Sequence, residues 1–196
     1  MEKNEGARRY ELVVIGGSAG ALGPLLDILK QLPATYPLPI IIVLHRLSNN
    51  EETLEHVLAH RSKLKVKEIE DKNVISGATV HVAPADYHLL IESNRTFALD
   101  VSEKVLFSRP SIDVTFDSVA QVYGKHTVAV LLSGANSDGT EGIKAIRKAG
   151  GLAIIQTPED AEISYMPQVA IESAGADYVL PANKIGEALI TILNWP

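Results

Sequence analysis

Residues 11–20 read Glu-Leu-Val-Val-Ile-Gly-Gly-Ser-Ala-Gly, and this stretch decides the fold of the chain. Its apolar run ends in a cluster of small residues, after which a helical pattern begins at Ala21. This order predicts a buried strand that turns sharply into a helix. Such a turn exposes one side chain at the carboxyl end of the strand, here Ser18, and directs the unpaired N–H groups of the helix towards it. Ser18 is therefore either a nucleophile or the small polar residue that a tight turn requires.

The composition is that of a single acidic domain. The chain has 196 residues, no cysteine, and 18 basic against 24 acidic side chains, which gives a net charge of −6. This length favours one domain, and the lack of cysteine excludes disulfides, thiolate catalysis and cysteine-based metal sites. The acidic balance argues against binding to nucleic acid or to an anionic membrane through bulk electrostatics.

The polar start of the chain and the short apolar runs favour a cytoplasmic location. Residues 1–10 predict a polar or disordered tail, because they lack the apolar segment of a signal peptide. The longest apolar runs, such as residues 40–44, are too short to span a bilayer. We expect residues 11–196 to form one domain that does not insert into a membrane.

Apolar runs and helical patterns alternate along the chain. We expect strands at residues 11–16, 39–44, 64–69, 78–83, 87–92, 95–100, 127–132, 151–156 and 177–180. We expect helices at residues 20–31, 51–61, 112–123, 139–149, 166–173 and 183–194. Several of the strands are continuously apolar, which is typical of a parallel sheet with helices on both faces. The pattern predicts an α/β fold, with a three-layer α/β/α, doubly wound, mainly parallel Rossmann-like sheet.

The middle of the chain departs from this alternation. Short turns, one of them at Ser93-Asn94, join the strands expected at 78–83, 87–92 and 95–100. Short connections favour antiparallel pairing. These runs therefore predict an antiparallel hairpin insertion.

Three polar side chains follow parallel strands and are therefore expected at one edge of the sheet. Ligands of such folds bind at this edge, beyond the carboxyl ends of the strands. Ser18 follows the first strand, His45 follows the second, and Asp138 lies in the segment after the strand at 127–132. An imidazole can take the proton of a serine hydroxyl and return it, and a carboxylate fixes the tautomer of the imidazole. Backbone N–H groups near Ala19 and Ala135 are candidates for binding an oxyanion.

The stretch from Gly16 to Gly20 matches the G-x-S-x-G pattern of a nucleophile elbow. The order Ser, His, Asp along this chain differs from the order Ser, Asp, His of α/β-hydrolases, so the chain is not one of them. A glycine-rich turn after the first strand is also typical of nucleotide-binding folds. Such folds, however, end the second strand with an acidic residue, where this chain has His45.

Several further short motifs follow one another along the chain. They are Val14-Ile15-Gly16-Gly17-Ser18-Ala19-Gly20, Leu44-His45-Arg46, Val82-Ala83-Pro84-Ala85-Asp86-Tyr87-His88, Arg109-Pro110-Ser111-Ile112-Asp113-Val114, Ser133-Gly134 to Ser137-Asp138-Gly139-Thr140-Glu141-Gly142, and Gln156 to Met166-Pro167. Together, over residues 10–194, they resemble the catalytic domain of the chemotaxis receptor methylesterase family, CheB.

The resemblance implies a serine hydrolase with a Ser-His-Asp triad at Ser18, His45 and Asp138. The implied reaction is the hydrolysis of glutamate methyl esters on the cytoplasmic signalling domain of chemoreceptors, with release of methanol. Family members also deamidate receptor glutamines. The resemblance implies no metal and no organic cofactor.

The chain departs from the family pattern at several places. The family often has Thr-Gly-Met-Gly before the aspartate, whereas this chain has Ser133-Gly134-Ala135-Asn136 and so lacks the bulky thioether beside the site. Ser108 stands where the family often has histidine. Typical members carry an N-terminal phospho-receiver domain, and residues 1–10 are too few for one. The chain is then either part of a longer protein or a stand-alone or fusion-derived esterase with another form of regulation.

Several other side chains have two interpretations each. Arg109 either binds a substrate carboxylate or receptor side chain or forms a surface salt bridge. Met166 either shapes the pocket wall or fills the core. Asp138 precedes a helix and could cap it as well as orient His45.

The remaining polar residues predict no further site. His56 and His60 have the i, i+4 spacing of a metal-binding pair, but no third ligand accompanies them, so we expect no metal site. Asp113 and Asp117 lie one helical turn apart and are expected on a solvated face. The other histidines are expected to be structural: His81, His88 and His126.

The sequence therefore favours a protein-glutamate methylesterase. One alternative is an esterase-like domain that has lost turnover and only binds a receptor or partner, which Ala135 and Asn136 motivate. The other alternative is a Rossmann-like nucleotide-binding module, which the glycine-rich turn motivates.

Overall fold

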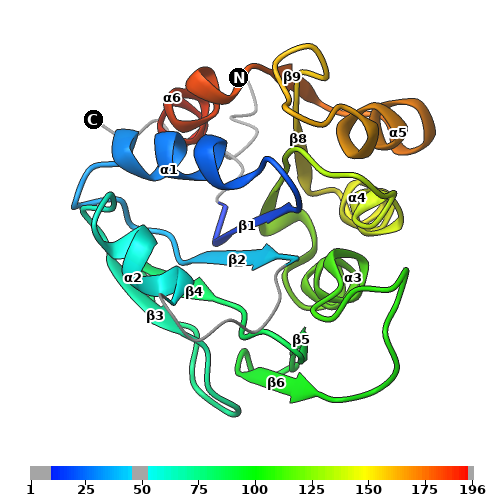
Figure 1. Ribbon diagram of the computed structural model, residues 1–196. Helices are drawn as coiled ribbons and strands as arrows, with labels where there is room; N and C mark the ends of the chain where they lie inside the picture. Colours follow the sequence, from blue (N-terminus) through cyan, green and yellow to red (C-terminus); the bar gives the residue numbers. More distant parts are fainter. Residues whose placement is uncertain (1–9, 46–52, 194–196) are drawn as a thin grey trace, which may run out of the picture.

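Within the described residues of the computed structural model, 10–45 and 53–193, seven parallel strands form a central sheet (Figure 1). They are β1 (Leu12–Gly17), β2 (Ile40–Leu44), β3 (Lys65–Glu68), β4 (Thr79–Val82), β7 (Thr127–Leu131), β8 (Leu152–Gln156) and β9 (Tyr178–Leu180). Their order across the sheet is β3-β4-β2-β1-β7-β8-β9. The strands β5 (His88–Ile91) and β6 (Phe97–Asp100) form a separate antiparallel hairpin.

Helices cover both faces of the sheet, which confirms the predicted three-layer α/β/α fold (Figure 1). One face carries α1 (Leu22–Gln31), α2 (Leu54–Ala59) and α6 (Ala182–Ile192). The other carries the hairpin, α3 (Ile112–Tyr123), α4 (Thr140–Lys148) and α5 (Tyr165–Ala174), and a short 3₁₀ helix, η1 (Gly124–His126), leads into β7.

The side chains of β1 show why a central strand is apolar throughout. Val13 and Ile15 pack in the core beneath α1 and α6, whereas Leu12 and Val14 pack in the core beneath α3 and α4. Successive side chains point to opposite faces of a strand, so a strand between two helical layers has no face for polar residues.

The prediction for the middle of the chain was right for the hairpin and wrong for the strand before it. The run at 78–83 does not pair with 87–92; it forms β4, which lies parallel to and between β2 and β3. All four residues of β4 are buried, so it belongs inside the main sheet. The connection to β5 turns through Asp86 in the left-handed region, at φ 64°, and takes the hairpin out of the sheet. A short connection alone does not determine which strands pair.

Two sequence predictions reach beyond the described residues. The tail predicted at residues 1–10 lies outside them except for Tyr10, and the predicted helix 51–61 corresponds to α2, with residues 51 and 52 outside. In the part of the chain that the structure describes, no helix is long and apolar enough to cross a bilayer.

The strand order reverses at β1, which lies between β2 and β7. Hydrogen bonds tie the segments that follow these strands to one another. The Ser18 N–H donates to the carbonyl of Ser133 at 2.9 Å, and the His45 N–H donates to the carbonyl of Gly17 at 3.2 Å. The sheet therefore brings the ends of β1, β2 and β7 to one place, where ligands of doubly wound folds bind.

Candidate active site

Ser18, His45 and Asp138 meet at this edge of the sheet and form a continuous hydrogen-bonded series. The Nδ1 atom of His45 lies 3.1 Å from Ser18 Oγ, and its Nε2 atom lies 2.7 Å from Asp138 Oδ2. The residues come from loops that follow β1, β2 and β7 and are 27 and 93 positions apart in sequence. The structure thus brings together the three residues that follow the ends of the predicted strands.

The orientation of the imidazole decides which nitrogen can act as a base. The Asp138 carboxylate can only accept, so the proton between Nε2 and Oδ2 belongs to the imidazole. In the neutral ring, Nδ1 then carries the lone pair and accepts the hydrogen of Ser18 Oγ. This is the arrangement that general-base activation of a serine requires.

Asp138 is completely buried and receives hydrogen bonds on both of its oxygens. Its Oδ1 accepts from Ser111 Oγ at 2.9 Å, from Asp113 N at 2.9 Å and from its neighbour Gly139 N at 3.0 Å. Its Oδ2 accepts from Ile112 N at 2.7 Å in addition to His45. Burial by itself raises the pKa of the Asp138 carboxyl, but the hydrogen bonds from His45, Asp113 and Ile112 outweigh it and hold this pKa below its ordinary value.

These contacts correct the expected capping role of Asp138. The side chain accepts from the first N–H groups of α3, so it caps mainly that helix, and at α4, which it precedes in sequence, it accepts only from the N–H of its neighbour Gly139. The first turn of α4 is instead capped by Asp113, whose Oδ1 accepts from Gly139 N at 2.9 Å and from Gly142 N at 2.8 Å. The two aspartates therefore cap each other's helices, and each carboxylate lies at the positive end of a helix dipole.

The prediction that Asp113 and Asp117 share a solvated face was right only for Asp117, which is exposed. Asp113 is partly buried because α3 and α4 pack together at their N-termini. Burial, aided by the nearby Asp138 carboxylate, raises the pKa of Asp113 to about 6 against the opposing hydrogen bonds from Gly142 and Gly139. Spacing along one helix does not reveal that a second helix covers the residue.

Asp113 is expected to make the protein less stable as the pH rises from about 4 to about 6. The folded chain keeps the Asp113 proton above the pH at which the unfolded chain loses it, so the free energy of unfolding falls across this interval. Asp113→Asn retains an oxygen for Gly139 and Gly142 and should flatten that fall. Urea unfolding between pH 4 and pH 7 measures it, with Asp117→Asn as the control. Equal pH profiles for Asp113→Asn and the unmodified protein would contradict the assignment.

Binding of an oxyanion by the backbone N–H groups of Ala19 and Ala135 stays a prediction. The amides of Ala19 and Ala135 have no acceptor among the described residues, and both residues are exposed. Ser133 braces the loops that carry them, because its Oγ donates to the Ala19 carbonyl at 2.8 Å and accepts from Ile163 N at 2.9 Å. Gly134 lies so close to Ser18 that a Cβ added to it would come within 3.0 Å of the serine Cβ.

Arg109 and Met166 have structural contacts in this conformation. One terminal nitrogen of Arg109, Nη1, donates to the carbonyls of Val101 and Ser102, each at 2.8 Å. These bonds hold the loop before α3. The alternative interpretation of Arg109 was a surface salt bridge, and Arg109 forms none among the described residues. Met166 is fully buried in the core and packs against Gly134. Substrate contact by either residue stays a prediction.

Two residues that support the series, Ser108 and Ser111, were not predicted to belong to the site. Ser108 Oγ lies 3.2 Å from His45 Nδ1. Ser111 donates to Asp138, and its own N–H donates to Nδ1 of the buried His88 at 3.2 Å. The available signal was the stretch from Arg109 to Val114, which belongs to the motifs of the resemblance but predicts no contact with a strand end by itself.

No metal site appears in the described part of the chain. His56 and His60 are exposed on α2 and at its end, and no group of three or more His, Asp or Glu side chains is placed to hold an ion there. His81 and His88 are buried and hydrogen-bonded to backbone, His81 Nε2 lying 3.0 Å from the Ser76 carbonyl and His88 Nε2 lying 2.9 Å from that of Glu103.

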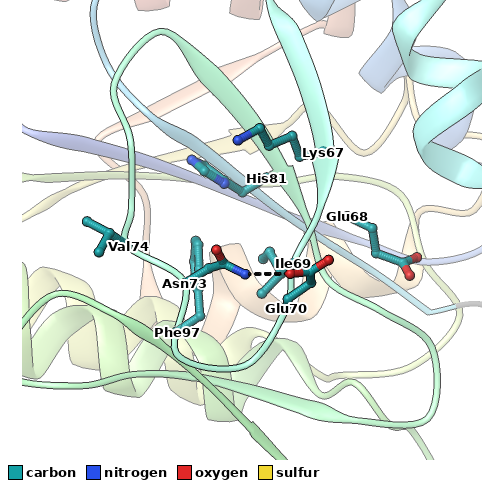
Figure 2. A pocket seen from close by; sticks show the side chains of 8 residues that line it. All are labelled: Lys67, Glu68, Ile69, Glu70, Asn73, Val74, His81 and Phe97. Carbon is teal, nitrogen blue, oxygen red and sulfur yellow. Dashed lines mark hydrogen bonds between the residues drawn. The ribbon is translucent and has the colours of Figure 1, made fainter.

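A separate cavity of about 400 Å³ lies beside β3 and the β5–β6 hairpin (Figure 2). None of the triad residues lines it. Several of its polar groups have partners within the fold: Asn73 Nδ2 donates to Glu70 Oε2 at 3.0 Å, and His81 Nε2 lies 3.0 Å from the Ser76 carbonyl. We assign no ligand to this cavity.

Comparison with known proteins supports the resemblance seen in the sequence. The family model for the CheB methylesterase matches residues 13–189. A protein of Leptospira interrogans is 45% identical over 183 residues, which cover 93% of this chain and 95% of that one. A protein of Thermotoga maritima, named protein-glutamate methylesterase/protein-glutamine glutaminase, is 38% identical over 186 residues, which cover 93% of this chain and 54% of that protein.

A solved structure agrees with these matches. The crystal structure of the Thermotoga maritima CheB methylesterase catalytic domain superposes with a TM-score of 0.89 at 39% identity, over 93% of this chain and 98% of that one. The family model, these relatives and the solved structure each cover about nine-tenths of this chain. The chain therefore belongs to the CheB methylesterase family.

Proposed function

We propose that this chain is a protein-glutamate methylesterase in which Ser18 is the nucleophile, His45 the general base and Asp138 the residue that orients His45. The observation that carries the proposal is the hydrogen-bonded series from Ser18 Oγ through both His45 nitrogens to Asp138. Its position at the reversal of strand order, and the names of the relatives, support the same function.

Acylation begins when Ser18 Oγ attacks the carbonyl carbon of the glutamate methyl ester. The hydroxyl proton passes to His45 Nδ1, and the carbonyl π electrons move to the oxygen, which the amides of Ala19 and Ala135 stabilise. Asp138 stabilises the imidazolium that results. The intermediate then expels methanol, whose oxygen takes the proton from Nδ1, and leaves a glutamyl ester on Ser18.

Deacylation repeats these steps with water. The water oxygen attacks the acyl carbon and gives a proton to His45 Nδ1, and the second intermediate releases Ser18 Oγ, which recovers that proton. The product is a glutamic acid side chain, which releases the second proton of the water to solvent and becomes a carboxylate, so one negative charge is added to the substrate protein. A glutamine side chain follows the same path with ammonia as the leaving group, which matches the second activity in the names of the relatives.

The proposed substrate is the cytoplasmic signalling domain of a methyl-accepting chemoreceptor, and the proposed location is the cytoplasm. The family model describes a CheB methylesterase, and an ester on a folded protein reaches this site only from the surface. Ser18 is partly exposed, with the exposed residues Ala19 and Ala135 beside it, so a side chain that projects from a receptor helix can approach the hydroxyl.

The wild-type protein should release methanol from a methylated receptor, and a fluorophosphonate should label Ser18 in it. Methanol is measured by gas chromatography, and the labelled residue is identified by peptide mass spectrometry. The unmethylated receptor is the control for methanol release. Labelling elsewhere, or an unlabelled protein without methanol release, would refute the proposal and favour an esterase-like domain that only binds its partner.

A further inference from the structure

His45 Nδ1 has two hydroxyl neighbours. Ser18 Oγ lies 3.1 Å and Ser108 Oγ 3.2 Å from the same nitrogen. With its Nε2–H bonded to Asp138, the neutral imidazole has one lone pair at Nδ1, which fully accepts one hydrogen. Ser18 and Ser108 therefore share that lone pair while the serine nucleophile is free.

The loop around Ser108 holds this hydroxyl in place. Val105 and Ser108 exchange two backbone hydrogen bonds, of 3.1 Å from Val105 N and 2.8 Å from Ser108 N, around Leu106 and Phe107. The Phe107 side chain is 95% exposed, so the loop owes its conformation to its backbone bonds and not to packing of that ring. Arg109 adds its two bonds to the carbonyls of residues 101 and 102.

When Ser18 is acylated, only one of the two residues can still donate a hydrogen bond to His45 Nδ1. The ester oxygen of an acylated Ser18 carries no hydrogen and can no longer donate to Nδ1, whereas Ser108 still can. Without Ser108, the ring would be held by the single bond between Nε2 and Asp138, about which an imidazole can pivot. With Ser108, the ring has two anchors, and Nδ1 stays directed towards the acyl carbon that water must attack.

We propose that Ser108 is a positioning residue for deacylation, which holds His45 in place during the half-reaction in which Ser18 cannot. The inference rests on the proposed function, because it needs an acyl-enzyme at Ser18. The proton still passes from water to His45 Nδ1, and Ser108 gives way to the water at that nitrogen. The hydroxyl is not needed for acylation, where Ser18 itself holds the ring.

Two measurements on the full chain separate the half-reactions. The rate of fluorophosphonate labelling reports how reactive the Ser18 hydroxyl is. The decay of acetyl-Ser18, formed with p-nitrophenyl acetate and followed by intact-protein mass spectrometry after desalting, reports deacylation. Ser108→Ala should slow the decay about 3- to 10-fold, the effect of one lost hydrogen bond, and should leave the labelling rate unchanged or raise it.

Two further variants control for damage to the loop. Ser108→Thr keeps the hydroxyl and should deacylate at close to the wild-type rate. Ser102→Ala lies in the same loop, its Oγ donates to Asp100 at 2.6 Å and it has no contact with His45, so both rates should stay unchanged.

Other outcomes overturn the inference. If Ser108→Ala slows labelling and decay by the same factor, Ser108 has a general structural role. If Ser108→Ala leaves the decay of acetyl-Ser18 unchanged, whether or not the labelling rate rises, Ser108 does not assist deacylation. If the wild type forms no acetyl-Ser18 and Ser18 is not labelled, the proposed function fails, and this inference fails with it.

Discussion

Ser18→Ala is expected to lower the rate of methanol release from methylated receptor by a factor of about 10³ to 10⁴ or more, because the attacking oxygen is removed. The free energy of unfolding should change by less than about 1 kcal/mol. Among the described residues, the side-chain hydrogen bond that is lost is the one with His45, which retains its bonds to Ser108 and Asp138. The backbone bonds of residue 18, to the Ser133 carbonyl and from the Ala21 N–H, do not depend on the side chain.

Methanol release and urea unfolding, measured on the same preparation, check this expectation. Ser93→Ala, in the exposed turn of the hairpin, is the matched control and should have wild-type activity. Undiminished turnover by Ser18→Ala would show that another group attacks the ester. Ser108 would then be the residue to replace next, because its hydroxyl lies at the same imidazole nitrogen.

Asp138→Asn is expected to damage both activity and stability, unlike Ser18→Ala. An amide in place of the carboxylate favours the wrong tautomer of His45 and does not stabilise the imidazolium, effects worth about 10⁴ in rate in a serine protease triad. The NH₂ group of Asn cannot accept the hydrogen bonds now made to one of the two oxygens, and buried donors are left unpaired. We expect a loss of about 2–4 kcal/mol in the free energy of unfolding at pH 7.

The pH dependence of that loss follows from the lowered pKa of Asp138. A carboxyl whose pKa is lower in the folded than in the unfolded chain stabilises the protein when the pH is above its pKa in the unfolded chain, which is near 4. This stabilisation is lost as the pH falls through the pKa of the carboxyl in the folded chain. The difference in stability between Asp138→Asn and wild type should therefore shrink in acid. Chemical unfolding at pH 7 and at pH 3–4 measures it, with the exposed Asp27→Asn as the control. A difference that stays constant would show that the charge of Asp138 does not contribute.

Much of the fold follows from short-range patterns. The run from Leu12 to Ile15 is apolar throughout because the strand is buried on both faces, and the small residues after it allow the turn into α1. The three strand-end residues could be selected because the carboxyl ends of parallel strands lie on one edge of a sheet. The pairing of β4 could not be predicted in this way, because it depends on which strand lies beside it in space and not on the length of the next connection.

The contacts of Asp113 and Ser108 that support the site could not be predicted from the sequence, for a similar reason. Asp113 has the sequence spacing of a surface residue, and only the packing of α3 against α4 places its carboxylate on the amides of Gly139 and Gly142. Ser108 is 63 positions from His45, and a single serine in a loop has no periodicity that would indicate a partner. Such contacts are not visible in local patterns because they join elements that are distant in sequence.

By itself, the amino-acid sequence determined the layered α/β architecture and the chemical groups at the strand ends, since the burial of a strand and the sharpness of a turn depend on neighbouring residues. Only the tertiary structure decided which imidazole nitrogen faces Ser18, that Asp138 and Asp113 cap each other's helices, and that Ser108 shares the lone pair of His45. The physical reason is that a hydrogen bond depends on a few tenths of an ångström and on direction, and these are set only when distant segments pack together.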